Sequence, residues 1–321
     1  MCFDFEAIWK GEIVKAVRYH SYGDSDVLVH EEVKRPVAGA GQVVLRVAGT
    51  AFNMLDVAIR ARILELPVAL PHIPNVDVAG VITEVGDGVT GWSVGDAVVG
   101  FLPATEPGAA AEYVAAPAKL LAAAPRTVEL ADASALPVAG LTAWQALFEN
   151  AGLKPGQSIL INGAGGGVGG YAVQLAVQAG ATVTATASAR SRDRVRSYGA
   201  GRVIDYTATP VMAALADRRF DVVLHLVRNS PEEAAQLADL VADGGTFVST
   251  TTPGPEEVGR GVRTEQVFVR SDAALLAELV ARVDAGDLQI DVAERRPLAD
   301  LVAVHDEAVA GRLAGKTVLI P

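Results

Sequence analysis

The ten residues INGAGGGVGG at 161–170 constrain the fold more than any other stretch, because six of them are glycine. Glycine loses more backbone freedom on folding than any other residue, so this density needs a structural reason. The apolar run SIL at 158–160 precedes it, and apolar residues at helical spacing follow it up to Gly180. This pattern predicts a tight turn between a buried strand and a helix, and not a slack linker between domains.

Strand and helix signals alternate around this turn, from about Ser134 to Val269. The β-like runs are SILIN, TVTATA, DVVLHLV and GTFVST, and helix-like segments separate them. One of these segments begins with Ser230-Pro231-Glu232-Glu233, which supplies an N-cap, a proline at N1 and a capping-box acid. Repeated βα units predict an α/β fold with a doubly wound parallel sheet that is covered on both faces.

The residues before these units have a different pattern. From Lys15 to about Ala124, short β-like runs are broken by turn residues, which predicts an irregular β-rich lobe. After Ser271 the sequence predicts a helix from Asp272, a strand around Ile290, a helix from Ala299 and a final strand KTVLI. This tail could continue either lobe.

Length, charge and cysteine content limit the class of protein. A chain of 321 residues is long enough for two lobes. A net charge of −11 argues against nucleic-acid binding, which needs a basic face. The only cysteine is Cys2, so neither a disulfide framework nor a thiolate zinc cluster is expected, and a cytosolic enzyme fits best. No apolar run reaches about 18 residues, and the N-terminus lacks the basic region of a signal peptide.

The glycine turn has the chemistry of a dinucleotide site. Its glycines allow a sharp turn and a close approach to a pyrophosphate, and the N-terminus of the following helix attracts negative charge. The residues concerned are Gly163, Gly165, Gly166, Gly167, Val168 and Gly169. The alternative is a tight strand–helix turn that binds nothing.

The end of the next strand indicates which dinucleotide would bind. An NAD site normally has an acidic residue there, about 20 residues after the glycines, to bind a ribose hydroxyl. This chain has Ser188, Arg190 and Arg192 instead, and guanidinium groups suit a 2′-phosphate. NADPH is therefore the expected cofactor, although the arginines could also form only an exposed, solvated helix start.

Taken together, several motifs resemble the zinc-independent, zeta-crystallin-like quinone oxidoreductases of the medium-chain dehydrogenase/reductase superfamily. They are the whole run from Leu136 to Ala181, KAVRYHSYG near the start, IPNVDVAGVITEVG, AAEYV, VIDY and GKTVLI. The resemblance implies a Rossmann domain at 134–271 inserted in a GroES-like catalytic domain at 15–133 and 272–321, an active site in the cleft between them, and a homodimer. Residues 1–14 would be an extension, and translation from Val14 is a hypothesis that mass spectrometry can test.

The same resemblance predicts a metal-free site. Related alcohol dehydrogenases hold a catalytic zinc with a cysteine three residues before an aspartate and with the histidine of a GHExxG motif. Here Asn53 precedes Asp56 by three residues, and Asn75-Val76-Asp77 replaces Gly-His-Glu. Neither the asparagine nor the valine supplies the thiolate or imidazole that zinc prefers.

Catalysis would then depend on positioning and on modest polarisation of the acceptor. By resemblance, Asn53 faces the nicotinamide and the acceptor, so its amide could donate to a developing oxyanion. Thr142 would lie beside the nicotinamide, Tyr206 near the 2′-phosphate, and Val227 in the cofactor site. The alternatives are a local turn bond for Asn53, a helix-entry hydroxyl for Thr142, and a core or rim role for Tyr206.

Two departures from the relatives affect the expected reaction. The stretch 58–74 lacks the tyrosine that can deliver a proton in enoyl reductases. HLVRNS replaces an aspartate and small glycines, so His225 is either a functional group or a buried neutral histidine, and Arg228 either crowds the pocket or attracts an acidic acceptor. We expect an NADPH-dependent quinone reductase. The alternatives are an enone or enoyl reductase and an NADPH-binding protein without turnover.

Overall fold

The computed structural model describes residues 12–321, and they form two compact units. The first unit contains the described residues up to Val138, Ser271–Ala285 and Val292–Pro321. The second contains Ala139–Arg270 and the short segment Gly286–Asp291. The predicted Rossmann segment, 134–271, covers nearly the same residues as the longer part of the second unit.

The second unit is built on a six-stranded sheet in the order β10-β9-β8-β11-β12-β13, in which every neighbouring pair is parallel. This is the doubly wound Rossmann order, and it confirms the predicted fold class. The direction of winding reverses between β8 and β11. The strands are β8 (Ser158–Asn162), β9 (Thr182–Ala187), β10 (Arg202–Asp205), β11 (Phe220–His225), β12 (Val241–Ser249) and β13 (Arg263–Gln266).

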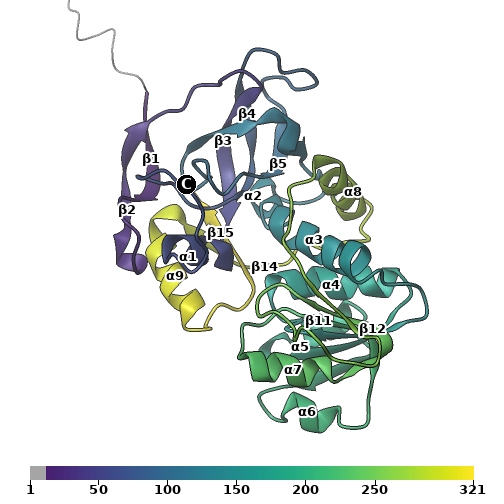
Figure 1. Ribbon diagram of the computed structural model, residues 1–321. Coiled ribbons are helices and arrows are strands. Elements are labelled where there is room, and N and C mark those ends of the chain that lie inside the picture. Colours follow the sequence, from purple (N-terminus) through teal and green to yellow (C-terminus); the bar gives the residue numbers. More distant parts are fainter. Residues whose placement is uncertain (1–11) are drawn as a thin grey trace, which may run out of the picture. The chain divides into compact units, whose positions relative to one another are not determined.

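Helices of the second unit pack on this sheet (Figure 1), with α4 on β8 and β9, α5 on β9 and β10, and α7 on β11 and β12. Their starts follow local signals: Ser230 caps α7 and accepts a bond from the N–H of Glu233, as its capping box predicts. The helices are α3 (Pro137–Trp144), which a π-helical segment (Gln145–Asn150) follows, α4 (Gly167–Gln178), α5 (Ala189–Ser197), α6 (Val211–Ala214) and α7 (Pro231–Ala238).

The first unit is built on a seven-stranded, largely antiparallel sheet in the order β14-β15-β3-β4-β5-β7, with β6 also paired to β3. β1 and β2 form a separate antiparallel pair. The strands are β1 (Ile13–Tyr19), β2 (Leu28–Lys34), β3 (Gln42–Ala51), β4 (Asp77–Val85), β5 (Ala97–Phe101), β6 (Tyr113–Pro117), β7 (Leu121–Ala123), β14 (Val292–Pro297) and β15 (Lys316–Ile320). In Figure 1, yellow β15 lies beside β3, which comes from the early part of the chain.

The α-helices of the first unit, within residues 12–321, include α1 (Met54–Arg60), α2 (Leu130–Ala133), α8 (Ala273–Asp284) and α9 (Leu301–Val309). Asp272 caps α8, where the sequence predicts a helix start. The strand expected around Ile290 begins later, at Val292. Of the predicted extension, residues 1–11 lie outside the described residues, and β1 already begins at Ile13.

The C-terminal tail, residues 271–321, contributes residues to both units. Most of it belongs to the first, but Gly286–Asp291 belongs to the second. The Gln174 side chain explains this, because it accepts a bond from the N–H of Gln289 at 2.7 Å and donates to the carbonyl of Gln289 at 3.2 Å. Asp291 also forms an ion pair with Arg194 at 2.7 Å.

Candidate functional site

The glycine turn between β8 and α4 cannot accept side chains at three of its positions. Gly163 has a φ of +96°, which an L-residue rarely adopts. A Cβ on Gly165 would lie 2.4 Å from the Ser191 Oγ. A Cβ on Gly169 would lie 2.4 Å from the carbonyl oxygen of Gly163 and 2.5 Å from the Cα of Ala164. These glycines are therefore required by the fold of the turn itself.

Gly166 differs, because the fold does not require it to lack a side chain. The nearest heavy atom to a Cβ on Gly166 is 3.5 Å away, and Gly166 is the exposed N-cap of α4 with a φ of −84°. The first N–H groups of a helix have no partner within the helix, and they attract anions. Space that a methyl group on Gly166 would fill, directly before the 12-residue helix that begins at Gly167, fits a pyrophosphate. Val168 follows in the first turn of α4.

The residues expected at the 2′-phosphate lie at the ends of β9 and β10. Ser188 is the N-cap of α5, Arg190 is exposed, and Tyr206 is 52% exposed directly after β10. Arg192 forms an ion pair with Asp205, at the end of β10. The end of β9 thus has no carboxylate, but the end of the next strand has one.

Arg194 is a residue of this site that sequence reasoning missed. Its guanidinium donates to the carbonyl of Gly165 at 2.8 Å and pairs with Asp291 at 2.7 Å. It therefore supports the glycine turn from the side of α5. Arg190 and Arg194 are four residues apart and so lie on one face of α5, but this spacing does not tell which arginine faces the turn.

Two further predicted residues lie in the second unit. Val227 is 41% exposed in the loop after β11, and its Cγ2 would lie 2.8 Å from a Cβ on Gly163, so it adjoins the glycine turn. Thr142 is buried within α3 and not at the start of that helix.

Asn53, the expected catalytic amide, lies in the first unit at the N-cap of α1. Its Nδ2 donates to the carbonyl of Ala51 at 3.2 Å and to the Oδ2 of Asp77 at 2.8 Å. Its Oδ1 accepts a bond from the Nζ of Lys316 at 2.8 Å, and its backbone N–H donates to Asp56 at 2.9 Å. The local turn bond is thus present, together with two long-range contacts that orient the amide.

The Asn53 amide belongs to a cluster with Lys316, Asp77 and Asp56, and the last three side chains are buried. The Nζ of Lys316 lies 3.3 Å from the Oδ2 of Asp77 and also donates to the carbonyl of Phe52 at 3.1 Å. Asp77, Asp56 and Lys316 are 0%, 3% and 6% exposed. Burial raises the pKa of Asp56 to about 7, and the nearby Asp77 carboxylate adds to this effect. Burial also raises the pKa of Asp77, while Lys316 opposes the shift.

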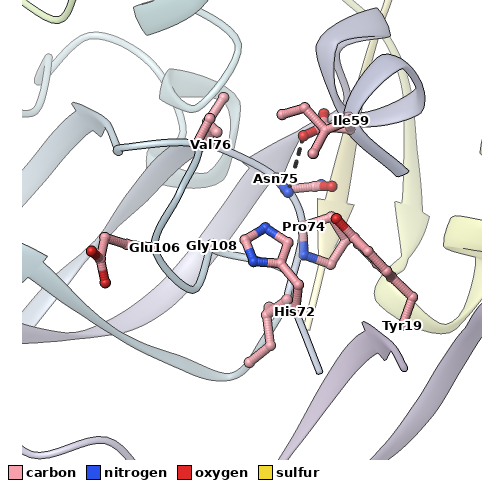
Figure 2. A pocket seen from close by; sticks show the side chains of 11 residues that line it. Tyr19, Ile59, His72, Pro74, Asn75, Val76, Glu106 and Gly108 are labelled. Atoms are coloured by element: carbon pink, nitrogen blue, oxygen red, sulfur yellow. Dashed lines mark hydrogen bonds between the residues drawn. The ribbon is translucent and has the colours of Figure 1, made fainter. Parts of the chain in front are cut away.

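A small pocket adjoins Asp56, and Figure 2 shows its lining. Asn75, which adopts a left-handed backbone conformation with a φ of 70°, donates its N–H to the Oδ1 of Asp56 at 3.1 Å. Among residues 12–321, the side-chain amide of Asn75 and the hydroxyl of Tyr19 have no hydrogen-bond partner. His72 lies edge-on to Tyr19 in the same lining, and burial lowers its pKa to about 4. The cavity has a volume of about 10 Å³, and the polar groups of Tyr19, Asp56 and Asn75 line it. It therefore suits a single water molecule.

The position that corresponds to the zinc histidine is Val76, which is buried between Asn75 and Asp77 in the chain. Within residues 12–321, no three His, Cys, Asp or Glu side chains are grouped as metal ligands. Nor does this part of the chain contain a helix long and apolar enough to cross a membrane.

Comparisons with known proteins agree with this geometry. The family described as "Alcohol dehydrogenase GroES-like domain" matches residues 39–126, and that described as "Zinc-binding dehydrogenase" matches residues 198–319. A chloroplast envelope quinone oxidoreductase homolog from Arabidopsis thaliana is 34% identical over 331 residues, which cover 97% of this chain and 99% of that protein. The chain belongs to the zeta-crystallin-like quinone oxidoreductase family.

Other members and structures extend the comparison. A 2-methylene-furan-3-one reductase from Solanum lycopersicum is 32% identical over 324 residues, covering 96% of this chain and 79% of that protein. The structure of the quinone oxidoreductase from Coxiella burnetii matches with a TM-score of 0.86 at 27% identity, covering 97% of this chain and 100% of the other. The predicted family is thus confirmed, and with it an oxidoreductase that uses a nicotinamide cofactor.

The raised pKa of Asp56 predicts how the stability of this protein depends on pH. Its carboxyl titrates near 7 in the folded protein and near 3.8 when unperturbed, so between these values the folded state binds one proton more than the unfolded state. The contribution of Asp56 to stability should therefore fall as pH rises from about 4 to 7. Relative to Asp56→Asn, the wild type should lose on the order of 2 kcal/mol of unfolding free energy between pH 5 and pH 8. Urea unfolding of both proteins at the two pH values checks this, and parallel pH profiles would contradict it.

Proposed function

We propose that this oxidoreductase is a metal-free, NADPH-dependent enzyme that transfers a hydride to a quinone or a similar conjugated carbonyl. The observation that carries the proposal is the open space at Gly166, the N-cap of α4, with Ser188 and arginines following β9 where an NAD site would have a carboxylate. A helix N-terminus favours the diphosphate, and guanidinium groups favour the 2′-phosphate.

When bound, NADPH supplies the hydride from C4 of its nicotinamide. The chain's own residues bind and orient it: the first turn of α4 receives the diphosphate, and Arg190, Arg192 and Tyr206 surround the 2′-phosphate. Arg192 is paired with Asp205 in the described structure, so it would share its guanidinium between the carboxylate and the phosphate. Thr142 and Val227 would lie at the nicotinamide.

Asn53 is proposed to polarise the acceptor carbonyl. Of its two N–H groups, the one that donates to Ala51 at 3.2 Å makes the longer bond, and this N–H would turn to the oxygen on which negative charge develops. The amide keeps its orientation because its other N–H donates to Asp77 and its oxygen accepts from Lys316. Such a donor supplies less polarisation than a Lewis acid does, which suits an acceptor that is already electron-poor.

The proposed reaction is tested by the oxidation of NADPH with a panel of quinones and enones. We expect turnover with electron-poor quinones, and an unchanged rate after extensive dialysis against a chelator, because Asn53 and Val76 cannot hold zinc as a thiolate and an imidazole would. A rate that disappears on chelation and returns with zinc would contradict the metal-free proposal. NADPH binding without turnover on any acceptor would favour a binding protein.

The cofactor preference is tested by replacing the arginines. We expect Arg190→Ala and Arg192→Ala each to weaken NADPH binding about tenfold and to leave NADH binding unchanged, because only the 2′-phosphate loses a charged hydrogen bond. Arg202→Ala is the matched control, since Arg202 is exposed at the opposite, amino end of β10. Titration calorimetry with both nucleotides gives the affinities. A wild type that binds NADH at least as tightly as NADPH would disprove the preference.

A second candidate is an enone reductase, which the 32% identical tomato 2-methylene-furan-3-one reductase favours. The same acceptor panel separates the two, because an enone reductase would prefer exocyclic or open-chain enones to quinones. Homodimer formation and a cytosolic location stay predictions. Plant relatives are named as chloroplast proteins, which favours a different location for those relatives.

A further inference from the structure

A continuous chain of hydrogen bonds runs beneath the glycine turn of the second unit. The N–H of Gly163 donates to the Oγ1 of Thr186 at 2.9 Å, and this hydroxyl donates to the Oδ1 of Asn162 at 2.7 Å. The Nδ2 of Asn162 lies 3.0 Å from the Nδ1 of His225. The Nε2 of His225 lies 2.9 Å from the Oδ1 of Asn229.

The first two links together fix the direction of the others. The backbone N–H of Gly163 can only donate, so the Thr186 hydroxyl accepts there, and it gives its single proton to the Asn162 Oδ1, which can only accept. The Asn162 oxygen therefore faces Thr186, and its NH₂ group must face His225. The Nδ1 of His225 must then accept, so the ring proton lies on Nε2 and is donated to Asn229.

The surroundings keep this imidazole neutral. His225 is 0% exposed, and Thr186 and Asn162 are 1% and 9% exposed. Burial lowers the pKa of His225, although the bond to Asn229 and the charge of Glu233 oppose the shift. A proton on Nδ1 would also face the NH₂ of Asn162, so protonation would break the chain of bonds.

The chain of bonds crosses the point where the sheet reverses its winding. Asn162 ends β8 and His225 ends β11, and these two strands are neighbours at that reversal. In doubly wound sheets, ligands bind in the crevice outside the strand ends at this point. On one side the chain of bonds begins at the glycine turn, and on the other it ends in the loop 226–230, which contains Val227.

The far end of the chain of bonds is also anchored. The N–H of Asn229 donates to the Oγ1 of Thr252 at 3.1 Å, and this hydroxyl donates back to the carbonyl of Asn229 at 3.0 Å. The hydroxyl of Thr251 donates to the carbonyl of Val227 at 2.8 Å. The loop 226–230 is therefore held both by His225 and by the loop after β12.

We propose that His225 is a positioning residue of the cofactor site. As a neutral ring with its proton on Nε2, it fixes the loop 226–230 relative to the glycine turn and thereby sets the affinity for the dinucleotide. This inference depends on the proposed function, because it takes the crevice at β8 and β11 as the cofactor site. It assigns to His225 and Asn229 a joint role in binding and no role in proton transfer.

Nitrogen NMR of the histidine side chains tests the chain of bonds without cofactor. At pH 7, the His225 ring should have the signature of a neutral imidazole with its proton on Nε2. His225→Asn identifies the signal by its loss. A proton on Nδ1, or a charged imidazole, would overturn the inference.

Cofactor affinity tests the positioning role. Asn229→Ala removes only the acceptor of the Nε2 proton, and His225→Asn keeps an acceptor for Asn162 but cannot reach Asn229. Loss of one such bond should weaken NADPH binding about fivefold to tenfold in each variant. His305→Asn is the control, because His305 is equally buried but belongs to the first unit, and its NADPH affinity should equal that of the wild type.

The outcomes separate the inference from the proposed function. Affinities in Asn229→Ala and His225→Asn equal to the wild type, with folded circular-dichroism spectra, would overturn the positioning role alone. A wild type that binds neither NADPH nor NADH would overturn both the proposed function and the positioning role. In that case the NMR signature still decides whether the chain of bonds exists.

Discussion

Gly166→Ala is expected to weaken NADPH binding about tenfold or more, equivalent to at least about 1.4 kcal/mol, without unfolding the protein. The new methyl group would meet no protein atom closer than 3.5 Å, and the backbone there, with a φ of −84°, suits alanine. Alanine is a poorer N-cap than glycine, which costs about 1 kcal/mol of stability or less. The methyl group would instead occupy the space in which the diphosphate is proposed to lie.

Gly169→Ala is the matched comparison, since it adds the same methyl group three residues later. Its Cβ would lie 2.4 Å and 2.5 Å from backbone atoms of Gly163 and Ala164, which cannot move without opening the turn. Overpacking of this kind costs about 1–3 kcal/mol. Thermal unfolding and nucleotide titration should therefore separate the variants: Gly166→Ala changes mainly affinity, and Gly169→Ala changes stability as well. Wild-type affinity in Gly166→Ala would contradict the location of the diphosphate at the start of α4.

Lys316→Met should be among the most destabilising single substitutions in the first unit. It removes the ammonium beside Asp77 and leaves two buried carboxyl groups, Asp77 and Asp56, without that cation. Breaking a buried ion pair by removing one partner costs about 3–5 kcal/mol. Urea unfolding at pH 7 measures this loss, which should be smaller at pH 5, where a larger fraction of Asp56 is protonated.

The double variant Lys316→Met/Asp77→Asn is the control for this experiment. An amide at position 77 needs no counter-charge, so the double variant should recover a large part of the lost stability. If Lys316→Met alone were as stable as the wild type, both carboxyl groups would have to be neutral in the folded protein. If the double variant were no better than the single one, the loss would come from packing and not from charge.

The second unit could be predicted closely from the sequence because its signals are local. The turn at 161–170, the strand TVTATA and the cap at Ser230 each depend on residues within one or two turns of each other, and the structure confirms these elements. Where the local signal is weak, the prediction is less accurate: the strand expected near Ile290 lies at Val292–Pro297. β14 is an edge strand whose residues are mostly half-buried or exposed, so it lacks the apolar alternation that marks a strand.

The contacts of the candidate site were less predictable, because they join distant parts of the chain. Lys316 and Asp77 are 239 positions apart, and no local pattern pairs them. The sequence does contain one signal, a lysine at the start of the otherwise apolar strand KTVLI, since a buried lysine needs a partner. Likewise, His225 could be recognised as buried and neutral, but its partners Asn162 and Asn229 follow from strand register and loop shape.

The place of β15 in the sheet determines which of the two units can fold first during synthesis. β15 lies between β14 and β3, and it brings Lys316 to Asn53 and Asp77. Every residue of the second unit precedes it in the chain. Because a ribosome releases the chain from its N-terminus onward, the second unit can complete its core first. The β-rich unit, although most of it is synthesised earlier, keeps the end of β3 at Thr50 and Ala51 without its β15 partner until the last strand emerges.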